Sequence, residues 1–324
     1  MIISRTPLRI SFAGGGTDFK EYYRRNGGAV VSTAINKYIY ITVNKKFDDR
    51  IRVSYAKTEI VDKVGDIHHD LVRECLRFLK IKGGVEITSI ADIPSEGTGL
   101  GSSSVFTVGL LNALYALRGE HCSAKKLAEN ACKIEIDIVG EPIGKQDQYI
   151  AAYGGLRFFE FRPDGDVFAD PIVCSRACRD ALSDNLIMFY LNITRRAGSI
   201  LQAQRDNIKD RLEFLHRLQE LALRMRAALI DNSLNDFGNL LHEGWLCKKG
   251  LADGITNSLI DGYYEKGIRA GALGGKVLGA GGGGFIIFYC PKSKQGNVRR
   301  ALKDLKETTF SFEPQGSKII YVEE

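Results

Sequence analysis

The chain has 324 residues, of which 44% are hydrophobic and 26% are charged, and this composition is that of an ordinary globular protein rather than a disordered one. No apolar run approaches the roughly 20 residues that span a bilayer, and the N-terminus is charged too early for a secretory signal, so we expect a cytoplasmic protein without a membrane partner. The net charge of +6 suits an anionic substrate. Because Lys and Arg are spread along helices that also carry Glu and Asp, we expect no nucleic-acid partner.

The first half of the chain mixes strands with helices. Runs rich in β-branched and aromatic residues predict strands at 2–12, 29–34, 38–46, 51–55, 84–90 and 155–161. Apolar residues at helical spacing predict helices at 67–80, 102–118 and 124–138. The second of these helices is apolar nearly all round, so we expect it to be buried.

The second half is mainly helical. A buried strand at 186–191 precedes a long amphipathic helix whose apolar residues run from Ile208 to Leu229, and Ser233 and Thr256 are expected to cap two more helices. The remaining predicted elements are a strand at 285–290, a helix at 293–307 and a strand at 318–322. Since strands follow strands and helices follow helices, the predicted fold class is α+β. Two domains are expected, 1–180 and 181–324, divided within the loop-rich stretch 162–184.

Glycine is the unusual residue type, because the 35 glycines fall into clusters at 14–16, 97–101 and 271–284. The middle cluster runs into three serines that open the buried helix. Alternate glycines let backbone N–H groups converge on an anion, and a helix N-terminus adds the positive end of its dipole. A Gly/Ser-rich turn with an N-cap serine explains the segment equally well. No lysine follows the last glycine, so a Walker A loop is excluded. The candidate phosphate-binding residues are Gly97, Gly99, Leu100, Gly101, Ser102, Ser103 and Ser104.

Two further glycine clusters have different contexts. The run at 279–284 follows Lys276 and precedes a predicted strand, whereas a dinucleotide fingerprint follows a strand and opens a helix, so an NAD(P)-binding interpretation fails. A backbone that yields to a neighbouring loop or ligand is the better interpretation. The cluster at 14–16 follows Arg9 and ends in Thr17 and Asp18, and taken alone it predicts a hairpin turn.

Two carboxylates occupy positions that favour a functional role. Glu135 shares the apolar face of its predicted helix with Ala131 and Cys132, where a carboxylate is unfavourable unless it meets a cation or a metal ion. Asp147 lies in a segment punctuated by Gly and Pro, directly after that helix. A surface or capping carboxylate is the alternative for each.

In their order and combination, the three glycine segments resemble the motifs of the GHMP family of small-molecule kinases. Segment 9–18 is most similar to the branch that acts on heptose and fucose-type sugars. The resemblance implies a ribosomal S5 domain 2-like N-terminal domain and a ferredoxin-like C-terminal domain, with the active site between them. It also implies transfer of the γ-phosphoryl group of ATP to the anomeric hydroxyl of a sugar phosphate, a heptose 7-phosphate, with a free-sugar kinase as the alternative.

The resemblance further implies roles for matching residues. Segment 97–104 would wrap the triphosphate, with Ser103 and Glu135 as ligands of Mg²⁺. Asp147 would take the proton of the substrate hydroxyl, and Arg9 would keep it ionised and offset charge on the transferring group. The substrate side would be formed by residues of the other two motifs, namely Thr17, Asp18, Gly281 and Gly282.

Three points bear on the substrate and on turnover. Where galactokinases have Glu-His, this chain has Gly15 and Gly16, which makes galactose a poor candidate. Arg195 and Arg196 follow the strand at 186–191 and are the candidates for binding the substrate's own phosphate, with solvation or pairing to nearby aspartates as the equal alternative. A non-catalytic sensor would be expected to have lost part of the catalytic and metal set, and this chain retains all of it. The oligomeric state is left open.

Overall fold

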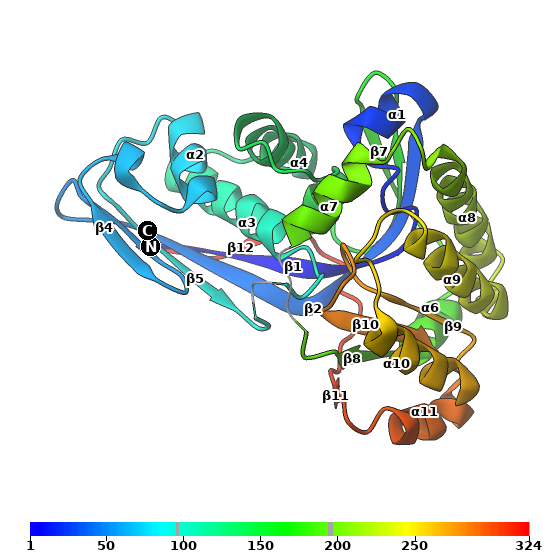
Figure 1. Cartoon of the computed structure of the whole chain (residues 1–324). Helices are drawn as coiled ribbons and strands as arrows, with labels where there is room; N and C mark the ends of the chain where they lie inside the picture. Colours follow the sequence, from blue (N-terminus) through cyan, green and yellow to red (C-terminus); the bar gives the residue numbers. More distant parts are fainter. Residues whose placement is uncertain (95–96, 194–196, 324) are drawn as a thin grey trace.

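The structure is a computed structural model that describes residues 1–94, 97–193 and 197–323. Within these residues the strands form an eight-stranded sheet and a four-stranded sheet, with helices packed around both (Figure 1). None of the helices in the described part of the chain is long and apolar enough to cross a membrane.

Two long antiparallel strands form the centre of the larger sheet. β1 (Ile2–Ala13) pairs along its length with β2 (Gly28–Lys45). On its other edge β2 pairs with β6 (Leu156–Phe161) through its first half and with β5 (Val85–Ala91) through its second. The outer strands of this sheet are β3 (Ile51–Ser54), β4 (Thr58–Val61), β7 (Val167–Pro171) and β12 (Lys318–Val322).

A buried helix covers the sheet from one side. α3 (Ser102–Leu117) packs against β1 and β2, and Gly109 permits the close approach, since a Cβ there would lie 2.7 Å from Thr6 Oγ1. Figure 1 shows α3 flanked by α2 (Asp70–Phe78) and α4 (Ala124–Cys132). Residues 133–138 continue α4 as a π-helical turn, and α5 (Gln146–Tyr153) packs against both α3 and β1.

The other face of β1 is also covered, which buries the strand from Thr6 onward. Side chains alternate along a strand, so Arg9 and Ser11 point away from Ile10 and Phe12. Phe12 packs edge-on against Phe237 of α9 (Leu234–Lys249), with ring centroids 5.2 Å apart. Arg9 is thereby left on the side of the strand that faces α5.

The smaller sheet is antiparallel and buried on both faces. Its strands lie in the order β11 (Lys306–Glu307), β8 (Leu186–Tyr190), β10 (Phe285–Tyr289) and β9 (Gly274–Val277). Phe288 packs on Tyr264 of α10 (Ser258–Arg269), whereas Tyr289 packs on Phe237. Burial from both sides explains why β10 is apolar throughout. The remaining helices are α1 (Lys20–Asn26), α6 (Arg176–Asp184), α7 (Ala197–Asp206), α8 (Leu212–Ile230) and α11 (Gln295–Ala301).

The predicted α+β class is confirmed, but several element boundaries were wrong. The strands expected at 29–34 and 38–46 are one strand, β2, because the pairing with β1 resumes at Tyr38 after a register shift that leaves Asn36 and Lys37 without partners on β1. The helix expected from Ile208 begins at Leu212, and α7 precedes it. Thr256 does not cap α10, because the side chain of Asn257 accepts the Ile260 N–H at 3.0 Å.

The last strand of the chain returns to the first sheet. β12 pairs antiparallel with β1, which brings the two ends of the described chain close together (Figure 1). The division into 1–180 and 181–324 stays a prediction, and residues after position 180 complete the larger sheet.

Candidate active site

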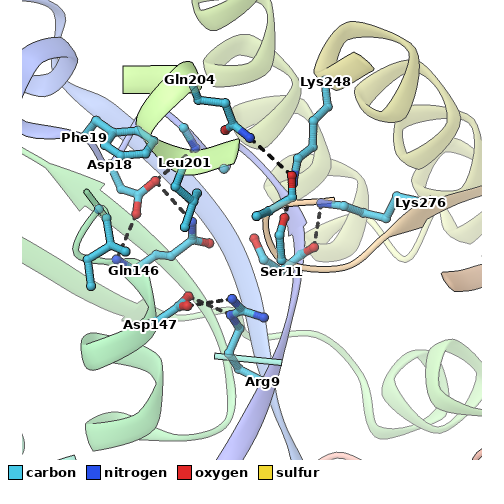
Figure 2. A pocket seen from close by; sticks show the side chains of 16 residues that line it. Arg9, Ser11, Asp18, Phe19, Gln146, Asp147, Leu201, Gln204, Lys248 and Lys276 are labelled. Carbon is cyan, nitrogen blue, oxygen red and sulfur yellow. Dashed lines mark hydrogen bonds and ion pairs between the residues drawn. The ribbon is translucent and has the colours of Figure 1, made fainter. Parts of the chain in front are cut away.

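A polar pocket opens where the two halves of the chain meet. Its walls come from β1, the turn after β1, the start of α5, α7, the end of α9 and the glycine run after β9. Figure 2 shows that charged and amide side chains from these elements point toward one another across the pocket.

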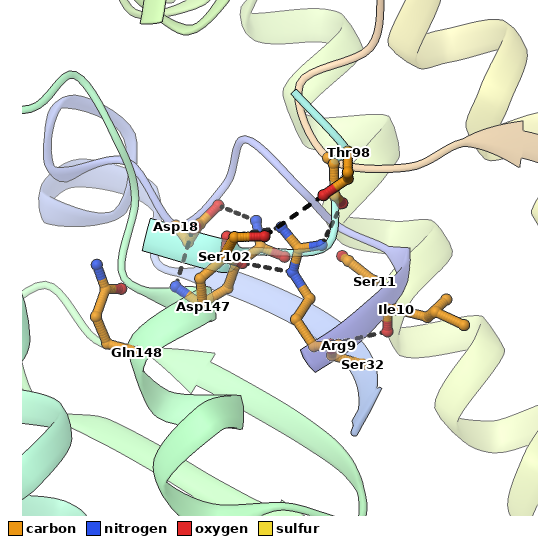
Figure 3. Close-up of polar contacts among 12 residues, drawn as sticks. Arg9, Ile10, Ser11, Asp18, Ser32, Thr98, Ser102, Asp147 and Gln148 are labelled. Atoms are coloured by element: carbon orange, nitrogen blue, oxygen red, sulfur yellow. Dashed lines mark hydrogen bonds and ion pairs between the residues drawn. The ribbon is translucent and has the colours of Figure 1, made fainter. Parts of the chain in front are cut away.

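Arg9 and Asp147 form the best-defined contact in the pocket. Arg9 Nε donates to Asp147 Oδ1 at 2.7 Å, and Nη2 donates to Oδ2 at 2.6 Å (Figure 3). Nη1 donates to the Gly99 carbonyl at 2.6 Å, so one guanidinium joins the carboxylate to the glycine loop. The Asp147 side chain keeps 22% of its surface exposed, against 5% for Arg9. The carboxylate can therefore meet a substrate while its partner stays fixed.

The glycine loop at 97–101 requires glycine at two positions, because of its backbone conformation and because neighbouring residues lie close to it. Gly99 and Gly101 have φ of +76° and +78°, in the left-handed region that disfavours a side chain. A Cβ on Gly101 would lie 3.1 Å from Asp147 Oδ2, and one on Gly99 would lie 2.4 Å from the Leu278 carbonyl. The loop then enters α3, whose free N–H groups begin at Ser102. The assignment of this loop to the triphosphate stays a prediction.

The glycine run after β9 packs against that loop. A Cβ on Gly279 would lie 2.4 Å from the Cα of Gly99, and one on Gly284 would lie 2.3 Å from the Thr98 carbonyl. The expectation that this run yields to a neighbouring loop is confirmed. Gly281 and Gly282 contact Ile255 instead, through a close approach to its carbonyl and a 2.8 Å hydrogen bond from Gly282 N. The pocket wall here is formed by the preceding residues, Gly279 and Ala280.

Glu135 is completely buried on the π-helical turn, next to the start of α3. Its carboxylate accepts hydrogen bonds from Gln148 Nε2 and, at 3.2 Å, from Thr107 Oγ1. Burial raises the pKa of Glu135 to about 7, although Gln148, Ser104 and Thr107 oppose the rise.

Of the serines at the start of α3, Ser104 and not the predicted ligand Ser103 is the one that interacts with Glu135. Ser104 interacts with the Glu135 carboxylate, whereas the Ser103 side chain is exposed and its carbonyl accepts from Thr107 Oγ1 at 3.0 Å. The described residues contain no cluster of three or more His, Cys, Asp or Glu side chains that would hold a metal ion. Glu135 and the serine hydroxyls at the start of α3 supply hard oxygen donors of the kind that suits Mg²⁺. The assignment of Ser103 and Glu135 stays a prediction.

Asp18 and Thr17 are adjacent, but only Asp18 faces the pocket. Its carboxylate accepts from Gly16 N at 3.0 Å and from Gln146 N and Nε2, both at 3.1 Å. Burial raises the pKa of Asp18, and the nearby Asp147 charge adds to the rise. The Thr17 hydroxyl contacts the Gly14 carbonyl at 2.8 Å and both backbone groups of Ala29 at 3.0 Å. Thr17 is fully buried behind the turn, and its role in binding the sugar stays a prediction.

Several pocket residues were missed from the sequence. Lys248 and Lys276 are buried and line the pocket, as do Gln146 and Gln204. One signal was available for Lys248, because it lies three residues after the buried Trp245 on the same helix face. Gln146 and Gln204 carried no comparable signal. The predicted phosphate-binding residues Arg195 and Arg196 lie outside the described residues.

Comparison with known proteins shows which family this chain belongs to. The model of the GHMP kinases N terminal domain matches residues 70–155, and that of the GHMP kinases C terminal domain matches residues 225–307. The D-glycero-alpha-D-manno-heptose 7-phosphate kinase of Campylobacter jejuni is 30% identical, with 98% of each chain covered. The chain is a GHMP kinase. It is therefore a phosphotransferase with an alcohol group as acceptor, and the family uses ATP as the phosphate donor.

Other GHMP kinases resemble this one over most of its length. The L-fucokinase/L-fucose-1-P guanylyltransferase of Bacteroides fragilis is 26% identical over 92% of this chain, which spans 35% of that longer protein. A D-glycero-D-manno-heptose 1-phosphate kinase from Bacteroides thetaiotaomicron has a solved structure with a TM-score of 0.83, 25% identity and complete coverage of both chains. A putative sugar kinase from C. jejuni superposes with a TM-score of 0.80 at 29% identity, covering 98% of this chain and 97% of that one. The expected two-domain fold of the family is confirmed.

Proposed function

We propose that this GHMP kinase transfers the γ-phosphoryl group of ATP to the anomeric hydroxyl of a heptose 7-phosphate and forms the 1,7-bisphosphate. The observation that carries the proposal is the bidentate pair of Arg9 and Asp147, inside a pocket and bonded to the glycine loop. Two similar proteins, one from C. jejuni and one from B. thetaiotaomicron, are named as kinases of heptose phosphates, and this supports the acceptor.

In the proposed mechanism Asp147 accepts the proton of the attacking hydroxyl. The hydroxyl oxygen forms the new bond to the γ-phosphorus as the bond to the β-phosphate oxygen breaks, and ADP leaves. Arg9 orients Asp147 through two hydrogen bonds and, through Gly99, fixes it relative to the phosphate loop. Such transfers depend on positioning and charge neutralisation, and a guanidinium shared by the base and the loop supplies both.

The proposal includes Mg²⁺, for which Glu135 and the serine hydroxyls at the start of α3 are the candidate ligands. Gln148 and Thr107 hold the Glu135 carboxylate in one orientation, and Ser104 is its neighbour on the loop side. When bound, Mg²⁺ would neutralise charge on the triphosphate. Ser103 is exposed at the same helix end and is the other candidate hydroxyl.

The sugar would lie against the turn that follows β1. Asp18 and Gln146 present a carboxylate and an amide to the pocket, and hydrogen bonds of this kind fix the orientation of sugar hydroxyls. Gly15 and Gly16 line this wall without side chains.

A coupled ADP-release assay across a panel of sugars and sugar phosphates tests the proposal. Transfer to the anomeric hydroxyl also removes the reducing end, so a reducing-sugar assay on the product should lose its signal in proportion to the ADP released. ADP release with the reducing end intact would refute the assigned position.

A free-sugar 1-kinase is the second candidate. The similarity to the L-fucokinase/L-fucose-1-P guanylyltransferase of B. fragilis favours it. Efficient turnover of unphosphorylated heptose or fucose, with no gain when the acceptor carries a phosphate, would select this function over the first.

A further inference from the structure

Two buried lysines form one wall of the pocket without meeting a carboxylate. Lys276 Nζ donates to the carbonyls of Ser11, at 2.7 Å, and Phe12, at 3.2 Å, and Lys248 Nζ donates to the Gly279 carbonyl. Neither ammonium forms an ion pair within the part of the chain that the structure describes. Figure 2 shows both side chains reaching the pocket from the side opposite Asp18.

An ammonium group in such a position is unfavourable unless an anion joins it. Each ammonium has three N–H groups; Lys276 uses two of them on carbonyls and Lys248 uses one. Three donors in total are therefore left for a ligand. Arg9 lies nearby and adds positive charge, but its own charge is already matched by Asp147.

Ser11 supplies an independent sign that a ligand belongs at this wall. Its side chain is only 6% exposed and lines the pocket, yet its hydroxyl has no hydrogen-bond partner among the described residues. Buried hydroxyls in folded proteins are nearly always hydrogen-bonded, so an orphan beside a ligand pocket indicates a missing partner. Because the Lys276 ammonium is bonded to the carbonyl of this same residue, one acceptor group can meet both.

We propose that Lys248, Lys276 and Ser11 form a phosphate-binding wall, whose expected occupant is the phosphate that the acceptor already carries. The inference rests on the proposed kinase function and specifies its acceptor as a phosphate monoester. A dianion satisfies the three free N–H groups and the orphan hydroxyl together, and it neutralises two buried charges. The γ-phosphoryl group of ATP offers the same oxygens and is the second source to distinguish.

Steady-state kinetics separates the two sources. Lys248→Met and Lys276→Met keep the apolar stems and remove the charges, and Lys249→Met is the matched control, because its ammonium pairs with Asp261 at 3.2 Å. With heptose 7-phosphate we expect kcat/KM to fall at least tenfold in both pocket variants, with less than a threefold change on unphosphorylated heptose. Equal losses on both acceptors with a raised KM for ATP would assign the wall to the γ-phosphoryl group. Wild-type kinetics in both folded variants would overturn the proposal.

A binding measurement keeps the site testable apart from turnover. Burial, with Arg9 nearby, lowers the pKa of Lys248 to about 8, although Asp18 and Asp147 oppose the change; burial with Lys248 and Arg9 lowers that of Lys276. A bound dianion stabilises the charged form, so inorganic phosphate should bind with proton uptake near pH 8. Calorimetry in two buffers of different ionisation enthalpy measures this uptake.

Comparison of the variants distinguishes failure of the proposed phosphate site from failure of the proposed kinase function. Wild type and Lys249→Met should take up protons with phosphate, and Lys248→Met should take up fewer; equal uptake in all three would overturn the site. Lys276→Arg retains the charge and serves if Lys276→Met does not fold. A wild-type protein that shows lysine-dependent phosphate binding, yet phosphorylates no sugar, would refute the proposed function and leave the site standing.

Discussion

Replacing Asp147 by asparagine perturbs the group on which the proposed mechanism depends. The amide keeps the size of the carboxylate but cannot accept the proton of the substrate. A positioned general base contributes roughly 10²–10⁴-fold to turnover, and we expect kcat to fall by a factor in that range. ATP binding should persist, because Arg9 keeps its hydrogen bond to the Gly99 carbonyl of the glycine loop.

The structure also sets the expected effect of this change on stability. Arg9 donates to both oxygens of Asp147, at 2.7 and 2.6 Å. In asparagine the amide oxygen can still accept one of these hydrogen bonds, but the NH₂ group is a donor and cannot accept the other. One charge-assisted hydrogen bond is lost, with a contribution of about 1.5–3 kcal/mol. Arg9 keeps its bond to the Gly99 carbonyl, so the variant should remain folded within the roughly 5–15 kcal/mol stability of a typical domain.

The assay is ADP release under saturating ATP and acceptor, with circular dichroism to confirm the fold and calorimetry to measure binding of a non-hydrolysable ATP analogue. Asp180→Asn is the matched control, since Asp180 is exposed on α6 and, within the described residues, pairs only with Arg176, at 3.6 Å. A folded Asp147→Asn protein with kcat within twofold of wild type would remove Asp147 from the mechanism.

Three further perturbations test the metal group, the loop and the turn. The pKa of the Glu135 carboxyl is near 4.5 in an unfolded chain and about 7 in the fold, so the free energy of unfolding should fall as pH rises from 4.5 to 7. This fall should be about 3 kcal/mol at most. Glu135→Gln should remove it, as measured by thermal shift across this pH range. Glu135→Gln should also raise the Mg²⁺ concentration needed for activity. Comparison of Ser103→Ala with Ser104→Ala identifies which serine hydroxyl binds Mg²⁺. Unchanged Mg²⁺ dependence in all three variants would refute the metal site. Gly99→Ala should lower the unfolding free energy by about 2–4 kcal/mol, through its positive φ and the 2.4 Å approach of a carbonyl, and a wild-type denaturation midpoint would contradict this. Thr17→Val should lower the free energy of unfolding by about 2 kcal/mol in chemical denaturation, because the buried Gly14 carbonyl and Ala29 N–H lose their hydrogen-bond partner. A loss of sugar affinity without a loss of stability would instead support a direct role of Thr17 in binding the substrate.

The sequence alone determined the α+β class, and it predicted the phosphate loop and the reacting pair. The glycine segments and the position of Glu135 are encoded locally, because glycines at fixed spacing specify a backbone path and helical periodicity places Glu135 on an apolar helix face. Arg9 and Asp147 stand 138 positions apart, and only the order of the glycine segments, through the family resemblance, linked them in advance.

Only the tertiary structure decided which side chains face the pocket. Thr17 and Asp18 are neighbours in sequence, yet packing against Ala29 turns one inward to hold the turn and leaves the other on the pocket wall. The lysine wall needs β9 and the end of α9 to meet β1, with Lys276 bonded to a carbonyl 265 positions away. Contacts of that separation are fixed by how the sheets and helices pack, and no local propensity or spacing specifies them.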